Sequence, residues 1–257
     1  MKHPLRPLLL AVCCGLAAAC TQRQERLKLM SYNIRNGIGI DNIQDIGRIA
    51  RVILREAPDL VALQELDSAT LRVDGRYIPG ELGRMTGMHA TFGRAIGFAG
   101  GSYGIGLLSR TEPLAVRSIP LPGREEARVL LMAEFPDYTV CITHLSLTPE
   151  DRLASLPIIR EATDTCRKPV LLAGDFNTGN AAAVLAGLGG GFRILSDTTR
   201  MTFPSDNPAV RIDYILGRGL PTSATVAESA VDHTATASDH CPLWVTLVWK
   251  RGKQPGK

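Results

Sequence analysis

The sequence feature that most constrains the fold is a series of short apolar runs that end in chemically reactive side chains. Five such segments, each with an acid, an amide or a histidine beside a strand-like run, are Ser31-Tyr32-Asn33-Ile34-Arg35, Gln64-Glu65-Leu66, Thr143-His144-Leu145, Gly174-Asp175-Phe176-Asn177 and Ser238-Asp239-His240. A sixth, Arg211-Ile212-Asp213-Tyr214, places an acid inside an apolar run. Ligand sites commonly form where strands end at a sheet edge. We therefore expect these side chains to face one cleft.

Each segment taken alone also has a purely structural explanation. Asp175 with Asn177 is typical of an Asx-turn, and His144 or His240 alone would more often be a core histidine with satisfied hydrogen bonds. Asp213 is harder to explain in this way, because an unpaired carboxylate in an apolar strand is costly to bury and needs a partner. The functional interpretation therefore depends on the whole set.

The remaining pattern predicts alternating strands and helices. Helical spacing or helix-start residues predict helices over Ile43–Ala57, Gly80–Thr86 and Pro149–Thr165, and a short one from Asn180. Apolar runs predict strands over Leu27–Ile34, Asp59–Leu66, His89–Arg94, Gly104–Ser109, Leu114–Ile119, Arg128–Phe135, Thr139–Leu145, Pro169–Ala173, Ile212–Leu216, Thr222–Ala230 and Leu243–Trp249. Mixed strands with outer helices predict two sheets packed face to face.

In this order, the segments resemble the endonuclease/exonuclease/phosphatase superfamily, the deoxyribonuclease I-like group. The resemblance covers Leu27–Val248, and its most specific parts are the "RIDYIL" and "ASDHCPLWV" sequences near the end. It implies an α/β fold, a four-layer α/β/β/α sandwich of two packed mixed β-sheets flanked by helices. It also implies metal-dependent hydrolysis of a phosphate ester by in-line attack of water.

The resemblance assigns three residues to a divalent cation. Glu65 is similar to the main ligand, with Asn33 and Asp239 close to it. Carboxylate and amide oxygens suit Mg²⁺, or Mn²⁺ in its place. The expected cofactor is therefore Mg²⁺ or Mn²⁺.

It assigns the other polar residues to catalysis and substrate binding. Asp175 would orient or deprotonate the attacking water, and Asn177 would hold phosphate oxygens. His240 would contact the scissile phosphate, with Asp213 as the carboxylate that fixes its tautomer. His144 would be a second histidine on the phosphate side.

Two further residues are candidates for substrate binding. Arg35 would be a cation near the phosphate, and Tyr103 would face the cleft. Position 105 departs from the family pattern, because many members have Asn where this chain has Ile105. The polar contact of that Asn is therefore missing.

The first residues have a different character. A basic start precedes the apolar run Leu8–Ala19, which is too short to span a membrane and is typical of a signal peptide. The run ends at Cys20 in a sequence that resembles a bacterial lipobox. We expect residues 1–20 to be a signal peptide with lipidation at Cys20, 21–26 a linker, 27–249 the domain and 250–257 a basic tail. The alternative is an ordinary signal peptide.

These features predict a monomer in the bacterial cell envelope. Its lipid anchor would hold it to a membrane, by default the outer membrane. The alternative is a periplasmic or secreted protein. The formal net charge is +4, but without the two cations of residues 1–20 and the four of residues 250–257 it falls to −2. Proteins that grip DNA non-specifically usually carry a basic surface. An extracytoplasmic nuclease acting on DNA or RNA is therefore possible but not favoured, and a non-catalytic binding module of the same fold is a third alternative.

The cysteines give no sign of a disulfide framework or a zinc site. Cys141, Cys166 and Cys241 remain in the body of the chain, an odd number at wide spacing. We expect them to act as small buried hydrophobic residues. A disulfide between one pair of them is the alternative.

Overall fold

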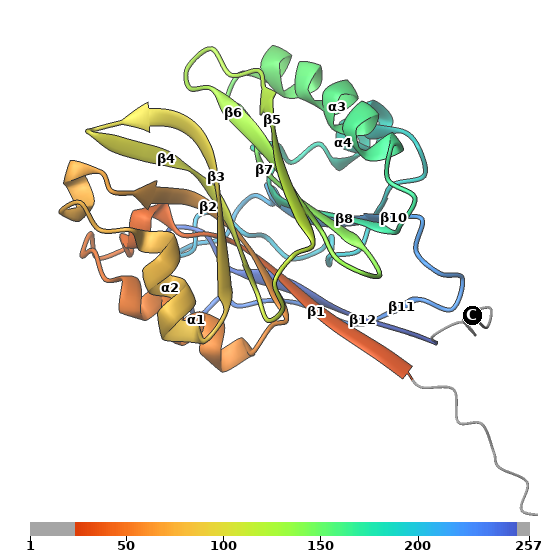
Figure 1. The fold of residues 1–257 in the computed structure, drawn as a ribbon, viewed down its shortest axis with the longest axis horizontal. Helices are drawn as coiled ribbons and strands as arrows, with labels where there is room; N and C mark the ends of the chain where they lie inside the picture. Colours follow the sequence, from red (N-terminus) through yellow and green to blue (C-terminus); the bar gives the residue numbers. More distant parts are fainter. Residues whose placement is uncertain (1–23, 251–257) are drawn as a thin grey trace, which may run out of the picture.

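Two β-sheets lie face to face in the computed structural model, which describes residues 24–250 (Figure 1). The predicted signal peptide, the lipidation at Cys20, linker residues 21–23 and the tail beyond Lys250 lie outside the described residues. Helices cover the outer face of each sheet (Figure 1). The predicted four-layer α/β/β/α sandwich is confirmed.

The first sheet has six strands. Their order across the sheet is β11 (Thr225–Val231), β12 (Leu243–Lys250), β1 (Gln24–Asn33), β2 (Leu60–Ser68), β4 (Gly101–Ser109) and β3 (His89–Phe98). β1 runs parallel to β2 and antiparallel to β12. It begins three residues before the predicted domain boundary, because Gln24 pairs with Lys250 on β12.

The second sheet also has six strands. Their order is β5 (Ala115–Leu121), β6 (Arg128–Glu134), β7 (Thr139–His144), β8 (Val170–Asp175), β10 (Asp213–Arg218) and β9 (Arg193–Ile194). β7 and β8 are parallel neighbours, and α3 (Pro149–Asp164) connects them. The two-residue β9 has no counterpart in the sequence prediction, because so short a strand leaves no periodic pattern.

The other helices begin and end at residues with clear capping roles. α1 (Ile46–Glu56) is capped by Asp45, whose side chain accepts from the backbone N–H of Arg48, and α4 (Ala181–Leu188) is capped in the same way by Asn180. α2 (Ile78–Thr86) ends at Gly87 in the left-handed conformation. Two short 3-10 helices, η1 (Arg35–Gly37) and η2 (Leu71–Val73), follow β1 and β2.

Three buried clusters hold these layers together. One lies between the two sheets, one between the first sheet and α1 and α2, and one between the second sheet and α3 and α4. Within residues 24–250, no helix is long and apolar enough to cross a membrane. All three cysteines in this range are free, with Cys141 and Cys241 buried as predicted and Cys166 partly exposed.

Candidate active site

Three neighbouring strands of the second sheet present polar side chains in a row. His144 ends β7, Asp175 ends β8 and Asp213 begins β10. Asp175 is the register partner of both His144 and Asp213. Alternate residues of a strand share a face, and Ala173, two positions before Asp175, lies in the core between the sheets. The row therefore points toward the first sheet.

Glu65 joins this site because β2 contains a bulge. The register between β2 and β4 shifts between Leu63 and Leu66, and Glu65 has a φ of 56°. In a regular strand Glu65 would share the face of Leu63, which packs under the helices. A bulge re-aims a side chain, and strain at a non-glycine residue with positive φ is typical of functional sites.

Asn33, the last residue of β1, connects the two sheets at this edge. Its Nδ2 donates to Glu65 Oε1 at 3.0 Å and to Asp175 Oδ2 at 3.2 Å, and lies 3.4 Å from His240 Nε2. Its Oδ1 accepts from the backbone N–H of Arg35 at 3.1 Å. Asn33 therefore faces Glu65 with its nitrogen, and ligation of a cation through oxygen, as the sequence predicts, requires rotation of the amide.

The loop before β12 carries the last two predicted site residues, Asp239 and His240. Ser238 Oγ donates to the carbonyl oxygen of Asn33 at 2.7 Å, which fixes this loop to the end of β1. Asp239 and His240 follow directly and therefore lie beside Asn33. The pairing of β1 with β12, together with this serine hydrogen bond, thus brings together the predicted neighbours from the two ends of the chain.

His240 and Asp213 form a buried pair. His240 Nδ1 lies 3.0 Å from Asp213 Oδ2, which also accepts from Thr202 Oγ1 at 2.6 Å. The ring of Phe203 packs against the imidazole with centroids 4.8 Å apart. Burial disfavours the imidazolium, but the charges and hydrogen bonding of Asp213, with the charge of Asp175, outweigh it and raise the pKa of His240 to about 10. The imidazole is therefore charged at neutral pH.

Asp175 lies at the centre of the site. Its Oδ1 accepts from the backbone N–H of Asn177 at 2.8 Å, and its Oδ2 lies 3.6 Å from His144 Nε2 and 3.7 Å from His240 Nε2. Burial and the negative charge of Asp213 raise the pKa of Asp175 to about 7. A carboxylate with such a pKa is suited to accept a proton from water near neutral pH.

His144 and Asn177 occupy the second-sheet side of the cleft. Burial, followed by the positive charge of Arg128, lowers the pKa of His144 well below its ordinary value, so this imidazole is neutral. Asn177 has a φ of 51°, and its Nδ2 donates to the carbonyl oxygen of Leu145 at 2.8 Å. Its amide therefore fixes the loop that carries it.

Glu65 and Asp239 make the acidic side of the site. Burial, with the negative charge of Asp239, raises the pKa of Glu65 against the hydrogen bond from Asn33. Asp239 Oδ2 lies 3.5 Å from Arg35 Nε, so the predicted cation Arg35 is at the rim. Among the described residues Glu65 has no ion-pair partner. Glu65 and Asp239 thus provide two carboxylates that share no cationic side chain within the described range. This suits a hard divalent ion such as Mg²⁺.

A second acidic group in the site has a different character. Asp175, Asp213 and His240 are the one set of described His, Cys, Asp or Glu residues whose ligand atoms all lie within 4.8 Å of one another. Asp213 Oδ2 already bonds His240, whose Nε2 contacts Asp175, while the buried Asp213 Oδ1 has no hydrogen-bond partner among the described residues. We interpret this set as a charge network rather than the cation site.

Beside Glu65 lies a wall formed by four residues. The sequence analysis predicted Tyr103 but missed Arg72, Glu126 and Arg128. Tyr103 is 8% exposed, and the guanidinium of Arg72 lies 5.2 Å from its ring centre. Tyr103, Glu126, Arg128 and His144 all line one cavity of about 10 Å³. The available signal was a charged residue beside an apolar strand, as in Glu126 before β6 and Arg128 at its start. Ile105, the departure from the family pattern, is buried between the sheets.

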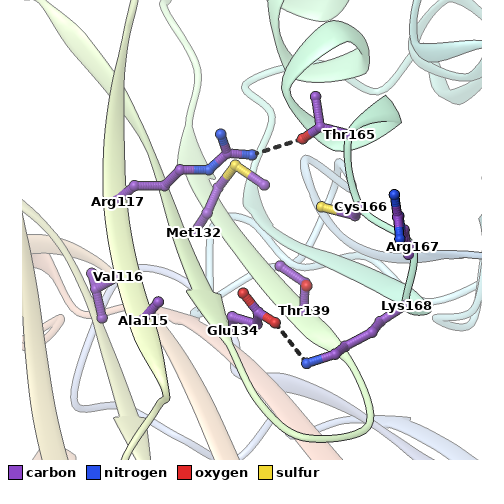
Figure 2. Close-up of a pocket in the computed structure, with 10 residues that line it drawn as sticks. All are labelled: Ala115, Val116, Arg117, Met132, Glu134, Thr139, Thr165, Cys166, Arg167 and Lys168. Carbon is purple, nitrogen blue, oxygen red and sulfur yellow. Dashed lines mark hydrogen bonds and ion pairs between the residues drawn. The ribbon is translucent and has the colours of Figure 1, made fainter.

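A much larger cavity lies elsewhere in the described residues. It has a volume of about 430 Å³ and is lined by residues at the opposite ends of β6 and β7 from the site, where Glu134 ends one strand and Thr139 begins the other. Figure 2 shows that Arg117 bonds Thr165 and that Lys168 pairs with Glu134. Two of its cations are therefore committed to structural bonds, and the cavity takes no part in the candidate active site.

Comparison with known proteins gives one family. The chain matches the Endonuclease/Exonuclease/phosphatase family over residues 30–240, which contain every site residue described above. No curated protein sequence matches the chain significantly.

Solved structures of similar fold come from several organisms. An endonuclease/exonuclease/phosphatase from Beutenbergia cavernae is 23% identical, with a TM-score of 0.70 over 88% of this chain and 72% of that one. A family protein from Bacteroides thetaiotaomicron is 20% identical, with a TM-score of 0.72 over 89% of this chain and 100% of that one. At these identities the likeness shows the fold.

Two other structures are described with a substrate or a product. A mannosyl-6-phosphatase of Bacteroides thetaiotaomicron is 19% identical, with a TM-score of 0.68 over 86% of this chain and 99% of that one. D. rerio TDP2 in complex with a single-strand DNA product is 22% identical, with a TM-score of 0.65 over 86% of this chain and 98% of that one. The same fold therefore appears with different phosphate esters.

Proposed function

The chain belongs to the endonuclease/exonuclease/phosphatase family, and from this premise we propose that it hydrolyses a phosphate ester with the help of a divalent cation. Family members are hydrolases of phosphate esters, and the dependence on Mg²⁺ or Mn²⁺ is part of the proposal. The carrying observation is that Asn33, from the first sheet, contacts both Asp175 of the second sheet and His240 of the loop before β12. This contact places a base and a cation in one cleft.

Asp175 is the proposed base. Its pKa of about 7 lets it be ionised and still accept a proton near neutral pH. The N–H of Asn177 and the amide of Asn33 fix its two oxygens. A water molecule held by Asp175 would attack the phosphorus in line with the leaving oxygen.

His240 is proposed to bind the phosphate through its positively charged imidazole. Asp213 occupies Nδ1, so Nε2–H is directed into the cleft. A charged donor at this place stabilises the negative charge that spreads over the phosphate oxygens in the transition state. His144, which is neutral, would donate a further hydrogen bond. No Ser or Cys nucleophile is required.

Glu65 and Asp239 would hold the cation. Rotation of the Asn33 amide, which gives up its hydrogen bonds to Glu65 and Asp175, would add Oδ1 as a third ligand. The chemistry that such an ion supplies is polarisation of the phosphate oxygens and shielding of the leaving oxygen. Arg35, at the rim beside Asp239, would help to hold the substrate.

The identity of the phosphate ester is a separate proposal. The net charge of −2 outside the two end segments gives no general attraction to a polyanion, so we favour a small phosphate ester over DNA or RNA. The related folds described with mannosyl-6-phosphatase activity and with a DNA product leave both chemistries to be tested.

The test is an assay of the purified protein with Mg²⁺, Mn²⁺ or EDTA. The substrates are p-nitrophenyl phosphate, its bis ester, sugar and inositol phosphates, sphingomyelin, RNA and plasmid DNA. We expect metal-dependent turnover that disappears in Asp175→Ala. A folded wild-type protein that binds no Mg²⁺ and turns over none of the panel would point instead to the non-catalytic binding module.

A further inference from the structure

Arg72 is a partly exposed arginine that is fixed from behind. Its Nε and Nη2 donate to the fully buried Asp67 at 2.6 and 3.2 Å, and Nη2 also donates to Asn36 Oδ1 at 2.6 Å. The guanidinium lies 4.6 Å from the ring centre of Phe98 and 5.2 Å from that of Tyr103. The side chain is 36% exposed, and Nη1 has no hydrogen-bond partner among the described residues. One rigid donor therefore remains free.

Glu126 is the acidic counterpart of this arrangement. Its side chain is 27% exposed, and Oε1 lies 3.2 Å from Nη1 of Arg128, whose own side chain is 6% exposed. Arg128 also pairs with Glu125, whose carboxylate accepts a hydrogen bond from Ser146 Oγ. A buried charge thus orients Glu126, just as buried Asp67 orients Arg72.

Tyr103 lies between these two groups and next to Glu65. Its ring contacts Arg72, and it shares the small cavity with Glu126. Burial, and then the negative charges of Glu65 and Glu126, raise the pKa of Tyr103, so its hydroxyl stays protonated. The wall beside Glu65 therefore offers a fixed donor, a fixed acceptor and a hydroxyl that is both.

The charges of this wall argue against a second phosphate group. Arg72 and Arg128 are balanced by Asp67, Glu125 and Glu126, which leaves one negative charge in excess. A hydroxyl group both donates and accepts, so a pair of neighbouring hydroxyl groups matches a wall with one donor and one acceptor. A polyanionic backbone would meet Glu126 with a like charge.

We propose that Arg72, Tyr103 and Glu126 form a hydroxyl-binding subsite beside Glu65, and that the substrate is a phosphate ester of a polyol. This inference rests on the proposed phosphoesterase function and names its substrate class. The residues of the subsite hold the alcohol part of the ester, while Asp175 and His240 act on its phosphate.

The test compares a polyol phosphate with an ester that has no hydroxyl groups. The substrates are mannose 6-phosphate and inositol 1-phosphate against p-nitrophenyl phosphate. In Glu126→Gln and Arg72→Lys we expect kcat/KM for the polyol phosphates to fall about 100-fold or more, because a site built for a hydroxyl group loses its paired contact. Turnover of p-nitrophenyl phosphate should stay within about threefold.

Matched controls come from the opposite end of β6 and from the loop between η2 and α2. Glu134→Gln removes a carboxylate that pairs with Lys168, and Arg76→Lys alters an arginine that pairs with Glu81. Both should leave the ratio of the two kcat/KM values unchanged. Thermal melts of all variants check that the fold is retained. Glu126→Gln and Arg72→Lys are chosen because they are conservative substitutions.

Different failures have different signatures. An equal loss on both substrates in Glu126→Gln, or a wild-type preference for DNA over polyol phosphates, overturns the subsite. Absence of any turnover in the wild type counts against the proposed function instead. In that case, titration calorimetry with mannose 6-phosphate still tests the subsite, which predicts binding that weakens about tenfold or more in Glu126→Gln, and equal binding in wild type and variant refutes it.

Discussion

Asp213 carries a carboxylate that is 1% exposed in the molecule, and His240 is the group that compensates it. The pair fixes the imidazole with Nδ1 toward Asp213 and keeps the ring charged. Because the folded-state pKa of His240 is raised, its contribution to stability is complete below pH 6.5 and is lost as the pH rises through about 10.

Asp213→Asn should therefore lower activity and change its pH dependence. Without the negative charge, burial dominates and the pKa of His240 falls, so the charged imidazole is lost at lower pH. We expect kcat/KM to drop by about 10²- to 10⁴-fold at neutral pH, as when the carboxylate partner of a catalytic histidine is neutralised. The alkaline limb of the pH profile should move to lower pH, and an unmoved limb would contradict the pairing.

Asp175 shows the opposite balance at the residue scale. Its folded-state pKa of about 7 lies above its ordinary value of 3.8. Its buried charge therefore lowers stability progressively as the pH rises from 3.8 to about 7, and in full above that. Asp175→Asn should abolish turnover and stabilise the fold by on the order of 2 kcal/mol at pH 8.

The pH dependence checks this assignment. The gain should shrink as the pH falls from 7 to 4 and vanish below that, where the carboxyl group is protonated in both folded and unfolded chains. Urea unfolding of both proteins at pH 4 and pH 8 measures the difference. An equal gain at the two pH values would show that the charge of Asp175 is not its cause.

At the scale of elements, the bulge of β2 decides which way Glu65 points. Its φ of 56° is a conformation that glycine adopts without the cost that other residues incur. We expect Glu65→Gly to be more stable than Glu65→Ala by about 0.5–1 kcal/mol, the reverse of the usual order within a strand. Both variants should lose metal-dependent turnover.

Urea unfolding of the two variants, with Mg²⁺ absent, gives the comparison. A Glu65→Ala protein at least as stable as Glu65→Gly would mean that the bulge relaxes when the carboxylate is removed. The strain would then belong to Glu65 and its bond from Asn33 rather than to the strand.

At the scale of the whole molecule, β1 separates the N-terminal end of the domain from the site. Gln24 begins this strand and Asn33 ends it, and the two ends lie far apart in Figure 1. Ten residues of strand span about 30 Å. The candidate active site therefore lies at the opposite end of β1 from Gln24, the first described residue after Cys20, where we propose the lipid.

Cys20→Ala should therefore release the protein from the membrane without changing its chemistry. Fractionation of cells should move it from the membrane to the soluble fraction. Its kcat/KM on p-nitrophenyl phosphate should stay within about twofold of the wild-type value, because the substitution lies outside the active site. A variant that stays with the membrane would refute lipidation at Cys20.

The sequence by itself determined the layer architecture and most of the site. Apolar runs of strand length between amphipathic helices can bury their faces only in stacked sheets covered by helices, and polar residues at the ends of those runs must meet at a sheet edge. Asn33, Glu65, His144, Asp175, Asp213, Asp239 and His240 were all predicted there, and the structure brings them together.

Only the tertiary structure decided how these residues share charge and which neighbours complete the site. The bulge at Glu65, the bond of Ser238 to β1 and the packing of Phe203 on His240 depend on contacts between segments far apart in the chain. Arg72, Glu126 and Arg128 resemble ordinary surface charges in the sequence. The orientation of Arg72 and Glu126 arises from burial of their partners Asp67 and Arg128, because a charge removed from water is stable only where folding supplies its counter-charge.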